Sequence, residues 1–153
     1  MPGDFWDTSG LAKLYVPERG SRWASDRVGE VLAVSELSLV EIASVLQRRF
    51  VEHQFTALER DEHYARFLAD AQAFQFIAVR DRLLARSAEL LVTGVFTSRL
   101  RSLDAIQLAS VLEWFEVARR LNIESGAFIV ADRPLREAAV ALGLPVENPE
   151  DYE

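Results

Sequence analysis

The stretch AFIVADRPLREAAVALGLPVE, residues 127–147, contains an apolar run, a helix-start signal and a short β-rich segment in immediate succession. Residues 127–131 predict a buried strand, and Asp132 before Arg-Pro is a good start for a helix over residues 133–142. Gly143 supplies the C-cap of that helix, and residues 145–147 are a candidate fifth strand. This order of strand, helix and strand predicts an α/β fold with a parallel sheet and right-handed crossovers.

The rest of the chain continues the alternation of short apolar strands and helices. Strands are predicted at residues 3–6, 31–35 and 74–79, and helices at 9–16, 20–28, 38–50, 56–73, 81–95 and 102–121. Pro17 stops the first helix, and Ser38 is expected to cap the helix that follows the second strand. We see no repeat, low-complexity stretch or linker. The chain is therefore expected to form one domain over residues 1–153, with a sheet of four to five mostly parallel strands.

Composition excludes several classes of protein. Half of the 153 residues are hydrophobic and 27% are charged, which is typical of a globular domain. Cysteine is absent, so disulfides, thiolate nucleophiles and cysteine-based zinc sites are excluded. We see no secretory signal and no apolar run near the roughly 20 residues of a membrane span, so we expect a soluble, cytoplasmic protein without a membrane partner. The net charge of −7 counts against simple nucleic-acid binding but not against an enzyme with an acidic pocket.

Four acidic residues lie at junctions between predicted strands and helices, or in a helix just beyond one: Asp7, Glu41, Asp104 and Asp132. The carboxyl ends of parallel strands converge on one edge of a sheet, where such folds bind their ligands. We therefore expect the four carboxylates to share one pocket. Clustered carboxylates repel one another unless a cation neutralises them, and oxygen ligands favour Mg²⁺ or Mn²⁺. The pattern thus predicts a magnesium or manganese site.

Three of these acids also have an ordinary structural explanation, whereas Glu41, inside a largely apolar helical segment, is harder to explain in this way. Asp7 and Asp132 would each cap the helix that follows. Asp104 lies in a first helical turn, where the helix dipole favours an anion. Taken singly, each acid is more often structural than catalytic, and only their joint placement supports a shared site. Asp4 comes before the end of its strand and is interpreted as a surface residue.

Hydroxyl and basic side chains lie near the acids in sequence. Thr8 and Ser9 follow Asp7 directly, where a hydroxyl either orients a carboxylate or a metal-bound water, or caps the helix. Basic residues would contact backbone phosphates or form ordinary surface ion pairs. The candidates are Lys13, Arg48, Arg49, Arg99 and Arg101, with Arg101 the preferred one. His53 and His63 lie in charged helical surroundings and are interpreted as solvated.

Taken together, the motifs resemble those of the PIN-domain family, and most closely the VapC-type toxins of bacterial and archaeal toxin–antitoxin pairs. The motifs are Asp7-Thr8-Ser9, Glu41, the run from Arg101 to Ala105 with Ala109, and Asp132-Arg133-Pro134-Leu135. LAKLYVPERGS and AAVALGLPVENP also look like segments of those toxins. The resemblance runs from end to end. One departure is Val130, where many relatives carry threonine or serine.

The resemblance implies a three-layer α/β/α PIN-like fold and a metal-dependent endoribonuclease that cleaves RNA. It implies Asp7, Glu41, Asp104 and Asp132 as the catalytic and metal-binding set with Mg²⁺ or Mn²⁺. It also implies a cognate antitoxin and a symmetric homodimer, to which the helix at 56–73 and the Trp114-Phe115 pair would contribute apolar surface.

Two kinds of alternative remain open. The chain could be a catalytically inactive PIN fold, or an acidic α/β module that acts by protein binding. Among such modules, a receiver domain is disfavoured because the third predicted strand ends in Val79-Arg80-Asp81 and the final segment has no lysine. A phosphohydrolase with an aspartate nucleophile is disfavoured as well, because its Asp-x-Asp motif after the first strand requires a second aspartate where this chain has Ser9.

Overall fold

The computed structural model describes residues 2–94, 96 and 99–152. In chain order the elements, with η for a 3-10 helix, are β1 (Gly3–Trp6), α1 (Thr8–Leu11), η1 (Ala12–Leu14), α2 (Ser21–Arg27), β2 (Leu32–Ser35), α3 (Leu37–Val51), α4 (Ala57–Asp70), η2 (Ala71–Ala73), β3 (Gln75–Ile77), α5 (Asp81–Thr93), α6 (Ser102–Arg120), β4 (Ser125–Ile129), α7 (Arg133–Ala141), β5 (Val146–Glu147) and η3 (Pro149–Tyr152).

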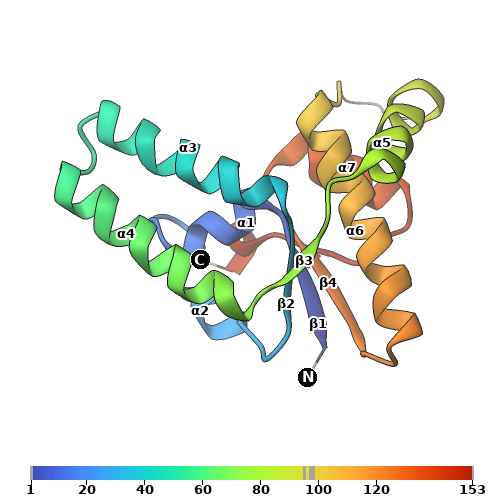
Figure 1. Ribbon diagram of the computed structural model, residues 1–153, viewed down its shortest axis with the longest axis horizontal. Helices are drawn as coiled ribbons and strands as arrows, with labels where there is room; N and C mark the ends of the chain where they lie inside the picture. Colours follow the sequence, from blue (N-terminus) through green and yellow to red (C-terminus); the bar gives the residue numbers. More distant parts are fainter. Residues whose placement is uncertain (1, 95, 97–98, 153) are drawn as a thin grey trace.

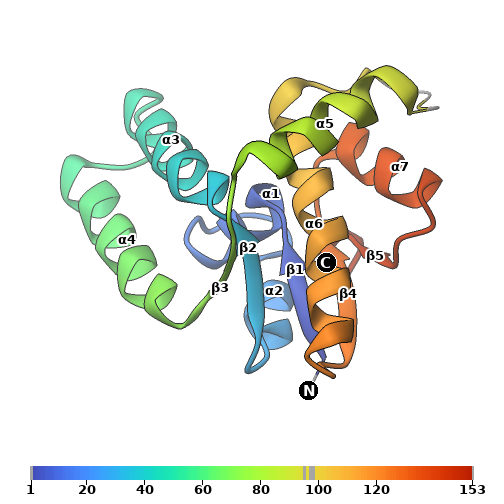
Figure 2. The ribbon, with the colours of Figure 1, turned by 45° about the vertical axis from the view of Figure 1, so that its right-hand side comes forward.

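The centre of the structure is a five-stranded sheet in the order β3-β2-β1-β4-β5, and every neighbouring pair is parallel. Helices lie on both sides of the sheet, with α1 to α4 on one side and α5 to α7 on the other (Figures 1 and 2). The predicted three-layer α/β/α architecture is therefore confirmed. β1 occupies the middle of the sheet, so the residue that follows it, Asp7, starts from the centre of the carboxyl edge.

Two apolar cores, one on each face of the sheet, hold the layers together. Successive strand residues point to opposite faces, so Phe5 packs against α6 while Trp6 packs against η1 and α3. Trp114 anchors the first core from α6, and its indole N–H donates to the carbonyl oxygen of Gly3 at 3.0 Å. Tyr15 anchors the second core and contacts Phe67 of α4 edge to face. Each such side chain contributes about 1.5–3 kcal/mol by burial, which fixes the helices against the sheet.

Helices α3 and α4 form a hairpin whose connecting end extends away from the sheet (teal and green in Figure 1). A capping box starts α4: Glu59 N donates to Thr56 Oγ1 at 3.1 Å, and Thr56 N donates to Glu59 Oε2 at 2.7 Å. The other end of the hairpin meets the carboxyl edge of β2 and carries Glu41. None of the helices in the described ranges combines the length and apolarity that crossing a bilayer requires.

Several element boundaries differ from those predicted. The first helix is shorter and continues as η1, the third strand has only three residues, and α3 begins before Ser38 with Glu36 at its N-cap position. Ser38 is therefore a buried first-turn residue and not the cap. The predicted end of the fifth helical segment, Val95, lies outside the described residues. Trp114 is buried at 2% exposure, so it cannot supply the exposed apolar surface expected of it.

Asp4 is buried, which makes its interpretation as a surface residue wrong. Its carboxylate accepts hydrogen bonds from Arg27 Nε at 2.8 Å and from the backbone N–H of Ala127 at 2.8 Å. Gly126 makes this approach possible, because a Cβ there would lie 2.0 Å from Asp4 Oδ1. Asp4 and Arg27 are 23 residues apart, and no local pattern indicates their pairing. Asp4 thus ties α2, β1 and β4 together.

We expect Asp4→Ala to lower the free energy of unfolding by roughly 2–4 kcal/mol, because Arg27 loses its buried carboxylate partner and the Ala127 N–H loses its acceptor. Urea denaturation measures the loss. Asp26→Ala, which removes an exposed aspartate from the same helix as Arg27, should change the unfolding free energy by less than about 0.5 kcal/mol. Equal stabilities of the two variants would contradict a buried structural role for Asp4.

Candidate active site

The four predicted acids line one pocket of about 510 Å³ at the carboxyl edge of the sheet, here called the acid pocket. Asp7 follows β1, Glu41 lies in α3, Asp104 lies in the first turn of α6, and Asp132 precedes α7. The predicted neighbours Thr8, Ser9 and Arg101 line the same pocket. The structure therefore brings together all seven predicted site residues, which lie up to 125 positions apart in sequence (132 − 7 = 125).

Asp7 is the most deeply placed of the acids. It is the N-cap of α1, and its Oδ2 accepts hydrogen bonds from the backbone N–H of Ser9 at 2.9 Å and from the Ser9 hydroxyl at 2.5 Å. Burial raises the pKa of Asp7 to about 7, even though the Ser9 hydrogen bonds lower it, and the charges of Glu41 and Asp132 raise it further. The Asp7 carboxylate has no cationic partner within the described part of the chain.

Ser9 joins the first strand to the fourth. Its hydroxyl oxygen accepts hydrogen bonds from the backbone N–H groups of Ala131 at 2.9 Å and Asp132 at 3.0 Å. Gly10 allows α1 to come this close to β4, since a Cβ on Gly10 would lie 2.6 Å from the carbonyl oxygen of Ile129. Ser9 therefore orients the Asp7 carboxylate and holds Asp132 near it. Its hydroxyl does not cap the helix, because Asp7 is the N-cap of α1.

Glu41 belongs to a polar network between α1, α3 and α6. Its Oε1 accepts from the Thr8 hydroxyl at 2.9 Å and from Gln107 Nε2 at 2.7 Å. Ser38 completes the network, with its hydroxyl 3.0 Å from Thr8 Oγ1 and 3.2 Å from Gln107 Nε2. Both donors reach the same oxygen of Glu41, so the network fixes the direction of its side chain. Ser38 and Gln107 were not predicted as site residues.

Asp104 and Asp132 are linked by Arg101. Asp104 Oδ2 accepts from the backbone N–H of Arg101 at 3.0 Å and from its Nε at 3.1 Å, while Arg101 Nη2 lies 3.9 Å from Asp132 Oδ1. Asp132 also caps α7, because its Oδ2 accepts from the backbone N–H of Leu135 at 3.2 Å. The ordinary structural explanations for Asp7, Asp104 and Asp132 are thus correct, and the same side chains also line the pocket.

Basic side chains also line the acid pocket. Arg48, Arg49 and Lys13 line it. Lys13 is only 5% exposed, and its Nζ lies 3.0 Å from Glu18 Oε1 and 2.6 Å from Glu150 Oε1. Arg49 pairs with Glu18 as well. Arg99, also predicted, is not among the lining residues. His53 is exposed, His63 packs against Phe55 with tilted rings, and neither histidine lines the acid pocket.

The acid pocket fits a hard divalent cation by its chemistry. Its donors are carboxylate oxygens, which Mg²⁺ and Mn²⁺ prefer, and the raised pKa of Asp7 reflects a buried acid without counter-charge. Gln107 Oε1 is a further buried oxygen that accepts no hydrogen bond from the described residues. Among the described residues, no group of three acidic or histidine side chains is arranged so that it could hold a metal ion. The four carboxylates therefore line one pocket without being placed at coordination distance from a common point.

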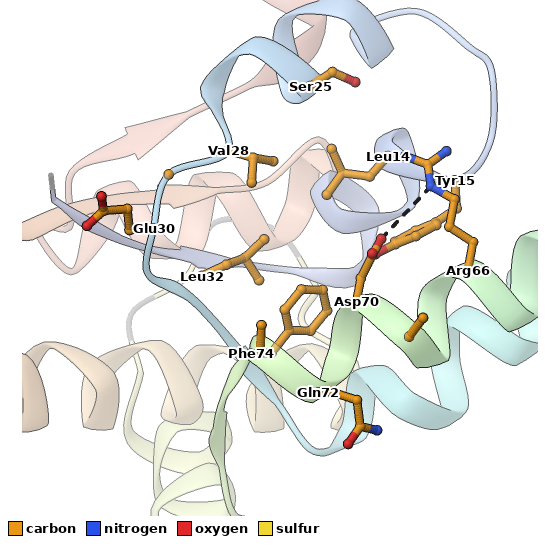
Figure 3. A pocket seen from close by; sticks show the side chains of 13 residues that line it. Leu14, Tyr15, Ser25, Val28, Glu30, Leu32, Arg66, Asp70, Gln72 and Phe74 are labelled. Atoms are coloured by element: carbon orange, nitrogen blue, oxygen red, sulfur yellow. Dashed lines mark hydrogen bonds and ion pairs between the residues drawn. The ribbon is translucent and has the colours of Figure 1, made fainter.

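A second cavity, of about 620 Å³, lies between η1, the end of α2, β2 and the end of α4 (Figure 3). Its walls are mainly apolar, with Leu14, Val28, Leu32 and Phe74 among the lining residues, and the Tyr15 hydroxyl donates to Asp70 at its side. Although larger, this cavity lacks the converging carboxylates of the acid pocket, so we place the candidate chemistry in the acid pocket.

The raised pKa of Asp7 predicts how the stability of the metal-free protein depends on pH. The unfolded chain ionises Asp7 near 3.8 and the folded chain near 7. The folded state therefore holds the extra proton between these values, and it loses stability as the pH rises through this window. The amide side chain introduced by Asp7→Asn cannot ionise. In EDTA, the free energy of unfolding of this variant relative to the wild type should therefore rise by on the order of 2 kcal/mol between pH 5 and pH 8.

Urea denaturation at the two pH values measures this difference. Asp81→Asn, a substitution of an exposed first-turn acid in α5, should follow the wild type at both. A pH dependence shared by the wild type and Asp7→Asn would show that Asp7 does not titrate near neutral pH.

Comparison with known proteins identifies the fold. No protein-family model and no curated protein matches the sequence. A toxin–antitoxin complex from Klebsiella pneumoniae matches over 96% of this chain and 98% of its own, with a TM-score of 0.60 and 18% identity. The sarcin–ricin-loop-cleaving toxin VapC20 of Mycobacterium tuberculosis matches over 79% of this chain and 85% of its own, with a TM-score of 0.55 and 21% identity. FitAcB from Neisseria gonorrhoeae matches over 95% of this chain and 97% of its own, with a TM-score of 0.61 and 13% identity. At these identities the likeness establishes a shared fold, and the chain therefore has the PIN-like fold expected from its sequence, in common with these three structures.

Proposed function

We propose that the protein is a metal-dependent endoribonuclease and the toxin component of a toxin–antitoxin pair. The observation that carries the proposal is the acid pocket, where four carboxylates from four elements converge and the most buried one, Asp7, lacks a counter-charge. A cluster of this kind is suited to a cation that activates water and binds phosphate. The shared fold supports the proposal, since one similar structure is that of a toxin which cleaves the sarcin–ricin loop.

Asp7, Glu41, Asp104 and Asp132 would hold the cation, which we propose to be Mg²⁺ or Mn²⁺. Such an ion supplies a nucleophilic water at neutral pH and neutralises charge on phosphate oxygens. The chain has no cysteine, and its histidines lie outside the acid pocket. Covalent catalysis by either residue type therefore has no candidate here.

The remaining groups of the pocket would orient the reactants. Ser9 binds Oδ2 of Asp7, so Oδ1 is the oxygen left to face a ligand. The guanidinium of Arg101 lies beside Asp104 and Asp132 and is largely exposed, which suits it to a scissile phosphate. Lys13 lies deeper and is already paired with two carboxylates, so an incoming phosphate would have to replace them.

Single-stranded or looped RNA is the proposed substrate. Its backbone bends into a narrow pocket more readily than a duplex, and its bases are open to contact. The net charge of −7 disfavours binding along an extended nucleic acid surface, so we expect recognition to depend on the few cations around the acid pocket. We place this activity in the cytoplasm, where cellular RNA is accessible.

The purified protein should cleave such RNA internally, and EDTA should abolish the cleavage. Asp7→Ala, Glu41→Ala, Asp104→Ala and Asp132→Ala should each reduce kcat by about 100-fold or more, since even groups that only support metal ligands are worth about 10–100-fold. Asp132→Ala should be the most tolerant of the four. Gel-based cleavage assays of a looped RNA measure the rates. Asp81→Ala serves as the control, because it removes an exposed first-turn acid outside the pocket.

Two results would reject the mechanism: cleavage that persists in EDTA, or cleavage that survives Asp7→Ala combined with Asp104→Ala. Metal binding without cleavage of any RNA would instead favour the alternative, an inactive PIN fold that acts by protein binding.

Two protein partners form part of the proposal. One similar structure is described as a toxin–antitoxin complex, and we propose a cognate antitoxin for this chain on that basis. We also propose a homodimer through the outer face of α5. Leu84, Ala88, Leu91 and Val92 are all exposed, with Val92 at 86%, and their spacing puts them on one side of the helix. A contiguous exposed apolar stripe of this kind is a candidate protein–protein interface.

Sedimentation velocity at tens of micromolar should show a dimer. Leu84→Glu combined with Leu91→Glu should convert it to a monomer, because each charge would be buried without a partner. Val140→Glu, at an exposed position of α7, should leave the dimer intact. A wild-type monomer at this concentration would remove the dimer and leave the nuclease proposal standing.

A further inference from the structure

Gln107 is a buried polar residue of the acid pocket that the proposed mechanism has not used. It lies three residues after Asp104 in α6, lines the pocket and is 1% exposed. Its Nε2 lies 2.7 Å from Glu41 Oε1, 3.2 Å from Thr8 Oγ1 and 3.2 Å from Ser38 Oγ. The amide therefore connects the helices that carry Asp104 and Glu41 with the segment that follows Asp7.

The contact with Glu41 determines which way the Gln107 amide points. A carboxylate oxygen only accepts hydrogen bonds, so the atom 2.7 Å from Glu41 Oε1 must be the amide nitrogen. The reverse orientation would place two acceptor oxygens against each other. The Thr8 hydroxyl donates to the same Glu41 oxygen, which leaves Ser38 as the donor in the Thr8–Ser38 hydrogen bond.

The other end of the amide is unsatisfied. Gln107 Oε1 is buried and has no hydrogen-bond partner among the described residues. Buried amide oxygens almost always accept a hydrogen bond, because desolvation without one is costly. Glu41 Oε2 likewise takes no hydrogen bond from any described residue, while Oε1 takes two. One oxygen of Glu41 is thus held by the protein, and its second oxygen and the Gln107 oxygen are both available to a ligand of the pocket.

We propose that Gln107 is a positioning residue for the cation site, an inference that rests on the proposed function. Its amide N–H group fixes Glu41 so that Oε2 is presented to the cation. Its Oε1 accepts a hydrogen bond from a water molecule that accompanies the cation. Gln107 itself is too deeply buried to touch RNA, so its influence passes through Glu41 and this water.

Mn²⁺ binding by the purified metal-free protein, followed by electron paramagnetic resonance and calorimetry, tests the inference. Gln107→Met and Gln107→Leu keep an apolar side chain of comparable bulk and remove both polar atoms. Each should raise the Kd for Mn²⁺ by about 10–100-fold, the usual effect of losing a group that supports a metal ligand. Each should leave the metal-free protein at least as stable to urea, because an unsatisfied buried oxygen is removed. In RNA cleavage, kcat should fall while KM for RNA stays unchanged.

Ser110→Ala is the matched control, since Ser110 is a buried polar residue one turn further along α6, bonded to Ser35 and outside the acid pocket. It should leave the Kd for Mn²⁺ unchanged. Wild-type affinity in both Gln107 variants would overturn the inference about Gln107 alone. Weaker binding accompanied by lower metal-free stability in both variants would indicate a merely structural role and would also overturn it. A wild-type protein that binds no Mn²⁺ would instead reject the proposed function on which the inference rests.

Discussion

A buried carboxylate at the end of the central strand is the constraint on which the candidate site depends. Asp7 leaves β1 at the middle of the sheet and is 4% exposed. It receives two hydrogen bonds from Ser9 but no counter-charge from the described residues. Burial and neighbouring acids raise its pKa to about 7, so near neutral pH the folded protein holds an ionised Asp7 only at a cost in stability. A bound cation would remove that cost.

The arrangement around Asp7 shows how a small fold combines structural and chemical roles in the same side chains. Three of the four acids satisfy backbone N–H groups at helix starts: Asp7, Asp104 and Asp132. A carboxylate that caps a helix with one oxygen is held in a fixed direction. Glu41 lies inside a helix, where no free backbone N–H is available, and the side chains of Thr8 and Gln107 orient it instead. Both kinds of hydrogen bonding fix the direction of the carboxylates before any ligand binds.

The three-layer architecture was implied by the resemblance to PIN domains. The residues themselves were sufficient to predict a parallel α/β sheet and the convergence of the four acids. Both follow from the alternation of apolar strands with helices, which places strand-end residues together at one edge. The burial of Asp4 and its structural role could not be predicted in this way. Asp4 and Asp7 are three residues apart, and only the distant Arg27 and the glycine at position 126 decide that Asp4 is a buried structural acid.

Gln107 was missed for a related reason. Its spacing of three from Asp104 placed it on the same helical face, but a lone glutamine in an apolar helix carries no motif. Its contacts with Thr8 and Ser38 join residues 99 and 69 positions apart, and these appear only when the helices pack. Element boundaries were also predicted less well. Ser38 resembles a cap, yet it lies in the first turn of α3, where its hydroxyl bonds to Thr8 of a different helix.

Anomalous diffraction from crystals of the wild-type protein soaked in millimolar Mn²⁺ at pH 8 tests the central claim most directly. The account predicts an anomalous peak in the acid pocket, in contact with Asp7 and at least one of the other three acids, and its loss in crystals of Asp7→Asn. An acid pocket without such a peak, in crystals that bind Mn²⁺ elsewhere or nowhere, would contradict the claim that the four carboxylates form a cation site.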